Sequence, residues 1–169
     1  MTKPIRQIRI EGNIAYVPLT KGYEAVIDAV DVPLVEGWNW HTANSRNMVY
    51  AVRREYSGMT SVFVKMHVLI GSPPDGFLVD HINGNGIDNR RANLRHATRA
   101  QNSRNQGIAS HNTSGFKGVS IKKGAKKYRA AICIEGKMKH LGLFPTAEKA
   151  HAAYVAASLS LHGEFGRRE

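Results

Sequence analysis

Asp80-His-Ile-Asn-Gly-Asn85 and Asp88-Asn-Arg-Arg-Ala-Asn-Leu-Arg95 bring carboxylate and amide oxygens close to one imidazole. Such hard oxygen donors suit Mg²⁺, which needs few protein ligands and keeps several waters. A neutral histidine near pH 7 suits the abstraction of a proton from water. Neighbouring side chains of a strand point to opposite faces, so Asp80 and His81 could do two jobs: one would bind a metal ion and the other would address water.

The chain carries a strong positive charge. Its 24 Lys and Arg residues against 13 Asp and Glu give a net charge of +11 over 169 residues. Such an excess attracts polyanions, and nucleic acid is the first partner to consider. We find no apolar run of the ~20 residues that a membrane-spanning helix needs, and no secretory signal at the N-terminus. Cys133 is the one cysteine, which excludes an internal disulfide and a zinc site built on paired cysteines. We therefore expect a cytoplasmic protein that does not bind membranes.

Composition and turn signals divide the chain into four parts. These are an N-terminal β-rich region, a core that holds the motif, a linker and a basic C-terminal region, over residues 1–60, 61–106, 107–113 and 114–169. The first part predicts two hairpins, around Glu11-Gly-Asn13 and Tyr56-Ser-Gly58, because strand-forming residues flank both turns. Trp38 and Trp40 are expected to be core or packing residues.

The basic C-terminal region predicts three strands followed by one helix. The strands cover 118–121, 128–134 and 137–144. The helix begins with Thr146 as its N-cap and stops at Gly163. Small and apolar residues repeat at helical spacing on one face of this helix: Ala150, Ala153, Tyr154, Ala157 and Leu161.

The core closely resembles the HNH family of phage and intron-encoded endonucleases. The resemblance covers roughly residues 60–106 and rests on the two motifs quoted above together with Thr98-x-x-Gln-Asn102. It implies a two-stranded hairpin followed by a helix, the ββα-metal fold, which grips one divalent ion. It also implies hydrolysis of DNA phosphodiester bonds, with 3′-hydroxyl and 5′-phosphate products.

The resemblance to the HNH family implies roles for four residues. Asp80 would be a metal ligand, and His81 would be the general base that activates the attacking water. Asn93 would hold the long loop so that His81 is oriented. Asn102, on the helix, would be the second metal ligand, at a position where many relatives carry histidine. Because an amide oxygen is a hard ligand, Asn102 favours Mg²⁺ or Mn²⁺ over a softer ion.

The C-terminal region resembles the AP2 DNA-binding domain. The resemblance covers residues 114–163 and rests on Ser114-Gly-Phe-Lys-Gly-Val-Ser120, Lys127-Tyr-Arg-Ala-Ala-Ile132 and His140-Leu-Gly-Leu-Phe144. That family packs a three-stranded sheet on one helix and lays the open face of the sheet in the major groove. The fold class of the whole chain is then α+β.

Basic residues of the core and of the C-terminal region are the candidates for DNA contact. The sequence does not separate phosphate contact from base reading among them: Arg90, Arg91, Arg95, Arg99, Arg104, Lys117, Lys122, Lys126, Lys127, Arg129 and Lys139. Four residues near His81 are expected to satisfy or cap loop backbone: Asn83, Asn85, Asp88 and Asn89. His67 is expected to pack rather than to catalyse, and Cys133 is expected to be buried.

Two functions remain open from the sequence. The first is a DNA endonuclease of the homing or free-standing phage type, which uses one Mg²⁺ or Mn²⁺ and is targeted by the AP2-like region. The second is a non-cleaving, sequence-specific DNA-binding protein, either a regulator or a decayed nuclease. The joint presence of Asp80, His81 and Asn102 favours the first, since a regulator would not need them. We expect double-stranded DNA as the partner and a monomer as the oligomeric state, with a dimer as the alternative.

Overall fold

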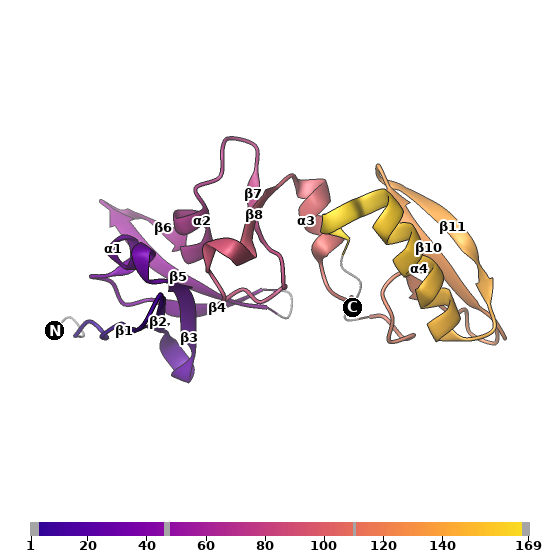
Figure 1. Cartoon of the computed structure of the whole chain (residues 1–169), viewed down its shortest axis with the longest axis horizontal. Helices are drawn as coiled ribbons and strands as arrows, with labels where there is room; N and C mark the ends of the chain where they lie inside the picture. The colour runs from indigo at the N-terminus through magenta and orange to yellow at the C-terminus, as the bar shows by residue number, and fades with distance from the viewer. Residues whose placement is uncertain (1–3, 46–47, 110, 167–169) are drawn as a thin grey trace. The chain divides into compact units, whose positions relative to one another are not determined.

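The computed structural model of the chain describes residues 4–45, 48–109 and 111–166. These residues form four small β-sheets and a few helices, in two compact units, Met1–Thr98 and Arg99–Glu169 (Figure 1). A mixture of small sheets and helices agrees with the α+β class that the sequence predicts. None of the helices in these ranges is long and apolar enough to cross a membrane.

The N-terminal sheet of the first unit has three antiparallel strands. They are ordered β1-β2-β3 and cover Arg9–Glu11, Ile14–Pro18 and Glu24–Asp28. The predicted hairpin around Gly12 is confirmed, since Glu11 pairs with Ile14 across the turn. Alternate residues of β2 and β3 are buried, as expected for a sheet with one face on the core: Ala15, Val17, Ala25 and Ile27.

The second antiparallel sheet contains β4, β5 and β6. These strands cover His41–Ser45, Met48–Ser57 and Thr60–Lys65. The predicted hairpin around Gly58 is confirmed, with Ser57 opposite Thr60. Trp40 is fully buried, whereas Trp38 is half exposed and packs its ring against the Arg53 guanidinium at 3.9 Å. Short helical segments complete this part: η1 (Thr20–Gly22), η2 (Ala29–Asp31), α1 (Val32–Val35) and α2 (Met66–Gly71).

The hairpin that carries the motif is formed by β7 (Leu78–His81) and β8 (Leu94–Ala97). A long loop joins the two strands and ends in the short helix η3 (Arg91–Asn93). This loop is hydrogen-bonded to β3: Val26 N donates to Ile87 O at 2.8 Å, and Asn89 N donates to Val26 O at 2.7 Å. The loop after His81 therefore extends the N-terminal sheet by one parallel bridge, between Val26 and Asp88.

The core of the first unit draws on residues from both sides of position 60. Met66 and Ile70 of α2 pack in the same buried cluster as Trp40 and the apolar residues of β2 and β3. Leu94 of β8 and Ile87 of the loop lie against this cluster. The N-terminal strands and the motif-bearing hairpin thus share one core, and neither buries its apolar residues alone.

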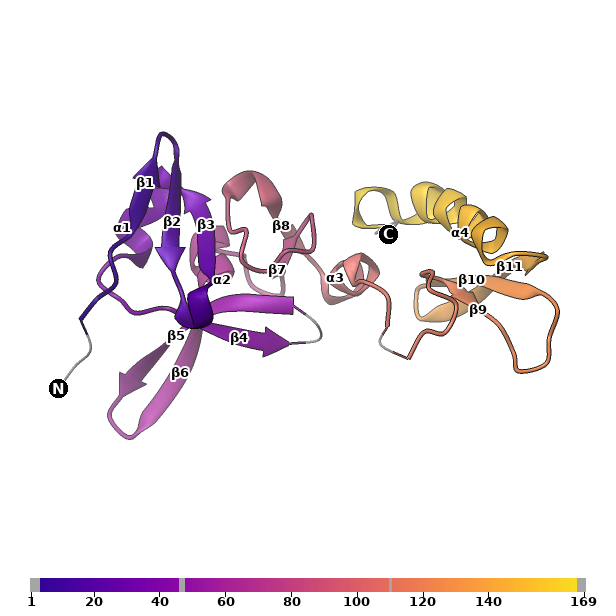
Figure 2. The same ribbon diagram turned by 90° about the horizontal axis from the view of Figure 1, so that it is seen from below.

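The second unit begins with α3 (Arg99–Asn105) and contains a three-stranded sheet with a helix on it (Figure 2). The strands β9, β10 and β11 cover Val119–Ser120, Tyr128–Ile134 and Lys137–Phe144, with β10 in the centre. Helix α4 (Ala147–His162) follows and leads into η4 (Gly163–Phe165). Thr146 caps α4 as predicted, since its Oγ1 accepts a hydrogen bond from Lys149 N.

Two predictions for the second unit are wrong. Leu161 is 42% exposed, and Ser158 and His162 occupy the buried face of α4 instead. The reason is that His162 Nε2 lies 3.0 Å from Cys133 O and Gly166 packs on Ser158, which fixes the rotation of the last turns. Cys133 is exposed rather than buried, because it alternates along β10 with Ile132, which points into the core.

We expect Gly118→Ala to destabilise the second unit more than Gly124→Ala does. Both glycines have positive φ (+72° and +80°), which costs an alanine about 1–2 kcal/mol. A Cβ on Gly118 would also lie 2.0 Å from the Tyr154 ring, whereas one on Gly124 would meet nothing within 4 Å. Urea unfolding of both variants measures the difference, and equal losses would show that the close approach to Tyr154 is unimportant.

Candidate active site

Asp80 and His81, the last two residues of β7, lie at the centre of the candidate site. Both are buried, with 6% and 4% of their surface exposed. In β8, Arg95 lies opposite Asp80 and Leu94 lies opposite His81. Because consecutive strand residues leave opposite faces, the carboxylate and the imidazole have different surroundings.

The His81 ring is enclosed by polar and aromatic neighbours. Its Nε2 lies 3.1 Å from Asn89 Oδ1. The ring centroids of His67 and Tyr50 lie 4.8 Å and 5.9 Å away. Burial lowers the pKa of His81, and this effect outweighs the opposing effects of its hydrogen bond to Asn89 and of the nearby carboxylates of Asp80 and Asp88. The imidazole is therefore in its neutral, basic form near pH 7.

Asp80 forms an ion pair with Arg95. The Nε and Nη2 atoms of Arg95 lie 3.0 Å and 2.9 Å from Asp80 Oδ2. The Arg95 side chain is 11% exposed, so the pair is almost enclosed. Arg95 is also a candidate for DNA contact; the structure places its guanidinium on the carboxylate beside His81, and contact with DNA stays a prediction.

Asn93 closes the loop that follows His81. Its Oδ1 accepts a hydrogen bond from Asn83 N at 3.0 Å, and its Nδ2 donates to Asp88 O at 2.7 Å. Its backbone oxygen accepts from Ile82 N at 2.9 Å. This is the geometry that a loop-holding residue requires, and the effect of Asn93 on catalysis remains a prediction.

The other polar residues of the loop have two kinds of role. The backbone role predicted for Asn83 and Asn85 is confirmed, since their Oδ1 atoms accept from Asn85 N and Ile87 N. For Asn89 the same prediction is wrong: its side chain is fully buried and contacts His81, because its backbone is hydrogen-bonded to β3. Asp88 is buried and accepts from Asn83 Nδ2 and from Arg90, whose hydrogen bond lowers the pKa of Asp88.

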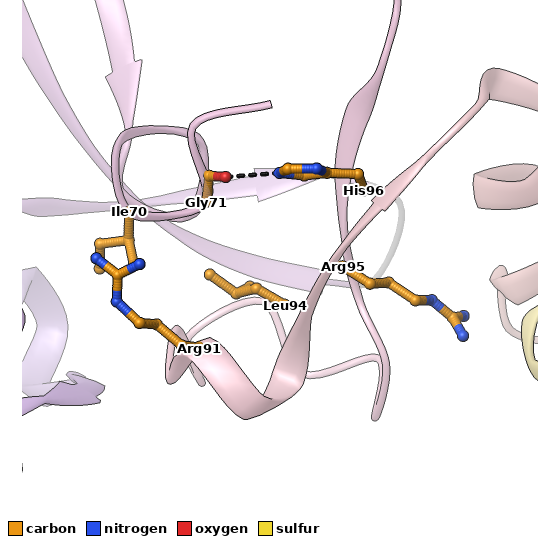
Figure 3. Close-up of a pocket in the computed structure, with 6 residues that line it drawn as sticks. All are labelled: Ile70, Gly71, Arg91, Leu94, Arg95 and His96. Carbon is orange, nitrogen blue, oxygen red and sulfur yellow. Dashed lines mark hydrogen bonds between the residues drawn. The ribbon is translucent and has the colours of Figure 1, made fainter. Parts of the chain in front are cut away.

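Two more of the predicted DNA-contacting arginines are bound to carboxylates. Arg90 pairs with Asp88 at 2.7 Å, and Arg91 pairs with the buried Asp31 at 2.6 Å. Figure 3 shows the pocket beside this hairpin, where Arg91 extends towards Ile70 and Arg95 points away from Leu94. His96 Nε2 lies 2.7 Å from Gly71 O on the rim of the same pocket. DNA contact by these arginines remains a prediction.

The remaining predicted residues belong to the second unit. Arg99, Asn102 and Arg104 lie on α3, and the pairing of Asn102 with Asp80 at a metal ion remains a prediction. Lys117 donates its Nζ to the backbone oxygens of Arg104 and Gln106, at the C-terminal end of α3. The other five basic candidates of this unit are exposed: Lys122, Lys126, Lys127, Arg129 and Lys139.

Strand register distinguishes the candidates on β11. Lys139 lies opposite Ile132, whereas His140 lies opposite Ala131 and Met138 lies opposite Cys133. Directly paired residues share a face, so the register places His140, rather than Lys139, on the same face as Cys133. The two-residue turn at Glu135-Gly136 sets this pairing, since Ile134 lies opposite Lys137, and a bulge between Ala130 and Ala131 shifts the register only beyond His140.

Comparison with known proteins identifies the family. The HNH endonuclease family model matches residues 65–104, which include α2, the β7–β8 hairpin and most of α3. An uncharacterized HNH endonuclease of Acanthamoeba polyphaga mimivirus is 30% identical over 158 residues, which cover 93% of this chain and 75% of that protein. The chain belongs to the HNH endonuclease family. This confirms the resemblance found in the core and makes the protein a nuclease.

A second viral relative of this HNH endonuclease is shorter. Protein 3.8 of Escherichia phage T7 is 35% identical over 97 residues, which cover 57% of this chain and 79% of that protein. No solved structure matches the chain. The AP2-like assignment of the C-terminal region therefore remains a prediction.

His67 forms one wall of the site in this HNH endonuclease. It lies on α2, is 6% exposed, and contacts the rings of His81 and Tyr50. Burial lowers the pKa of His67 to about 3, with smaller contributions from His81 and Lys65. These contacts agree with the packing role expected for His67.

We expect the first unit to lose stability as the pH falls from 6.5 towards 3. Unfolded His67 takes up a proton near its ordinary pKa of 6.5, whereas folded His67 stays neutral until about pH 3. The contribution of neutral His67 to the free energy of unfolding is complete above pH 6.5. Below pH 6.5 it declines by at most about 1.4 kcal/mol per pH unit. Urea unfolding at pH 7 and pH 5 should show a smaller loss for His67→Phe than for wild type, and an equal loss would contradict the assignment.

Proposed function

We propose that the protein is a metal-dependent DNA endonuclease, of the homing or free-standing phage type, in which His81 is the general base. The observation that carries the proposal is a buried, neutral imidazole directly after a carboxylate in the hairpin that matches the HNH family. A base must be unprotonated at working pH, and burial keeps His81 in that form. The family membership favours this function over a non-cleaving regulator.

The donor chemistry fits Mg²⁺ or Mn²⁺. Within residues 4–45, 48–109 and 111–166, no group of three or more His, Cys, Asp or Glu side chains could hold a metal ion. A site built on Asp80 would therefore rely on an amide oxygen, water and substrate, as Mg²⁺ sites commonly do. Asp80 and Asn102 are the residues that would hold the ion. When bound, it would offset the negative charge that develops on the phosphate and the leaving 3′ oxygen.

Four residues of the first unit have proposed roles in the hydrolysis: His81, Asn93, Tyr50 and His67. His81 takes a proton from the water that attacks phosphorus, the bond between phosphorus and the 3′ oxygen breaks, and the 3′ oxygen takes a proton from solvent, which gives 5′-phosphate and 3′-hydroxyl ends. Asn93 keeps the loop closed behind His81 through its bonds to Asn83 and Asp88. Tyr50 and His67 pack on the ring and limit its rotation. A nuclease of this kind needs a single such site for each strand that it cuts.

The second unit is the proposed reader of duplex DNA. Its sheet carries α4 on one face, and Arg129 and Cys133 are exposed on β10. Lys122, Lys126 and Lys127 are exposed on the segment that connects β9 to β10. A β-sheet face flanked by cations fits the major groove and the phosphates beside it. The arrangement supports AP2-like targeting.

We expect His81→Ala to lower the rate of plasmid relaxation by about 10²–10⁴-fold, because the base is lost. Asp80→Asn should also abolish most activity, since the carboxylate that would hold the ion is lost. EDTA should stop the wild-type reaction and Mg²⁺ should restore it. His111→Ala, which changes an exposed histidine of the second unit, is the matched control and should cut normally. Full activity in His81→Ala would reject the assigned role.

The exposed basic residues Lys122, Lys126, Lys127 and Arg129 of the second unit should determine how DNA binding depends on salt. Each phosphate contact contributes about 0.9 to the slope of log affinity against log salt. Lys126→Ala and Lys127→Ala should each reduce that slope by about this amount. Lys149→Ala, an exposed lysine on α4, is the control and should leave the slope unchanged. Fluorescence anisotropy with a labelled duplex measures all three, and equal slopes would contradict the reader role of the two lysines.

A further inference from the structure

We propose that Asn89 is a positioning residue that fixes the tautomer of His81 and so decides which ring nitrogen accepts the proton of water. The inference rests on the proposed role of His81 as general base. A neutral imidazole has one protonated and one basic nitrogen, and the hydrogen bond made by one determines the state of the other. The partner of His81 Nε2 therefore determines which nitrogen of the ring can act as the base.

The contact between the two side chains is buried. Asn89 Oδ1 lies 3.1 Å from His81 Nε2, and the two residues are 0% and 4% exposed. A hydrogen bond enclosed in this way does not compete with bulk water. Its loss would leave a polar atom buried without a partner, which is costly.

The second contact of the amide determines which way it faces. Asn89 Nδ2 lies 3.5 Å from Met66 Sδ. A thioether sulfur accepts weakly and cannot donate, so it suits the NH₂ group and not the carbonyl oxygen. Turning the amide over would place two acceptors, Oδ1 and Sδ, against each other. The oxygen of Asn89 therefore faces His81.

This orientation fixes the proton on His81. A carbonyl oxygen can only accept, so His81 Nε2 must carry the hydrogen and donate it to Asn89. The lone pair of the neutral ring is then on Nδ1. The basic nitrogen of the proposed nuclease is thus Nδ1.

The N-terminal strands hold Asn89 in place. Its backbone N–H donates to Val26 O of β3, as described above. The loop before it is also packed tightly, because a Cβ on Gly86 would lie 2.5 Å from Val49 O and 2.9 Å from the Tyr50 ring. Elements that precede the motif in the chain therefore set the state of its catalytic histidine.

The test combines a spectroscopic measurement with kinetics on the full chain. A long-range ¹⁵N–¹H NMR spectrum of histidine-labelled protein at pH 8 reports which nitrogen of His81 carries the proton. We expect a single tautomer in wild type, protonated at Nε2. In Asn89→Ala, His81 should no longer be held in the Nε2-protonated tautomer. The spectrum should then show a mixture of both tautomers or fast exchange of the Nε2 proton. Asn89→Asp keeps an acceptor and should retain the wild-type tautomer.

The kinetic measurement separates positioning from binding. We expect Asn89→Ala to lower kcat about 10- to 100-fold while the KM for DNA stays unchanged, and Asn89→Asp to recover part of the rate. Asn44→Ala changes an exposed asparagine of β4, outside this loop, and is the control. Thermal unfolding shows whether each variant is folded. If Asn89→Ala does not fold, Asn89→Asp still tests the proposal.

Three results would be decisive. A wild-type His81 protonated at Nδ1 would overturn the proposal whatever the activity. An unchanged spectrum and kcat in a folded Asn89→Ala would overturn it as well. If wild type shows the Nε2 tautomer and Asn89→Ala loses it, but wild type cuts no DNA with Mg²⁺ or Mn²⁺, the role of Asn89 stands and the proposed nuclease mechanism fails.

Discussion

The hydrogen bonds between β3 and the loop after β7 hold the candidate site together. Val26 bonds to Ile87 and Asn89 through its N–H and its carbonyl oxygen, and this pairing directs the Asn89 side chain inward to His81. The same loop is closed from its other side by Asn93. The motif itself forms only two short strands, β7 and β8. Hydrogen bonds to the N-terminal sheet hold the loop between these strands in place.

The two neighbouring residues at the end of β7 have different surroundings. The imidazole of His81 is surrounded by aromatic rings and an amide, which keep it neutral. The carboxylate of Asp80 is equally buried and is paired with the guanidinium of Arg95. Side-chain alternation along a strand makes this separation possible, because the two groups face different neighbours.

Local signals in the sequence predicted most elements of the fold. Turn residues and alternation were enough for the hairpins around Gly12 and Gly58, and capping residues were enough for α4. The environment of His81 could not be predicted in the same way. Asn89 faces inward because of a bond to a strand far earlier in the chain, and Leu161 faces outward because His162 bonds to β10. Both depend on contacts that the sequence pattern does not contain.

The structure brings three residues of the motif together and gives the neighbouring arginines carboxylate partners. Asp80, His81 and Asn93 lie together on and beside one hairpin. Each of the neighbouring arginines predicted to contact DNA has a carboxylate partner in the structure, and that contact stays a prediction: Arg90, Arg91 and Arg95. Those partners come from the loop, from the N-terminal region and from β7, and the spacing of charges along the chain does not reveal such pairs.

The pairing of Arg95 with Asp80 means that this acidic group already has a cation before any ion arrives. A carboxylate buried without a counter-charge would weaken the fold, and the guanidinium of Arg95 offsets part of that cost. Any ion that takes Asp80 Oδ2 must replace two hydrogen bonds from Arg95. The ion uptake proposed for this position would then be an exchange of one cation for another, and its strength would reflect the difference between the two.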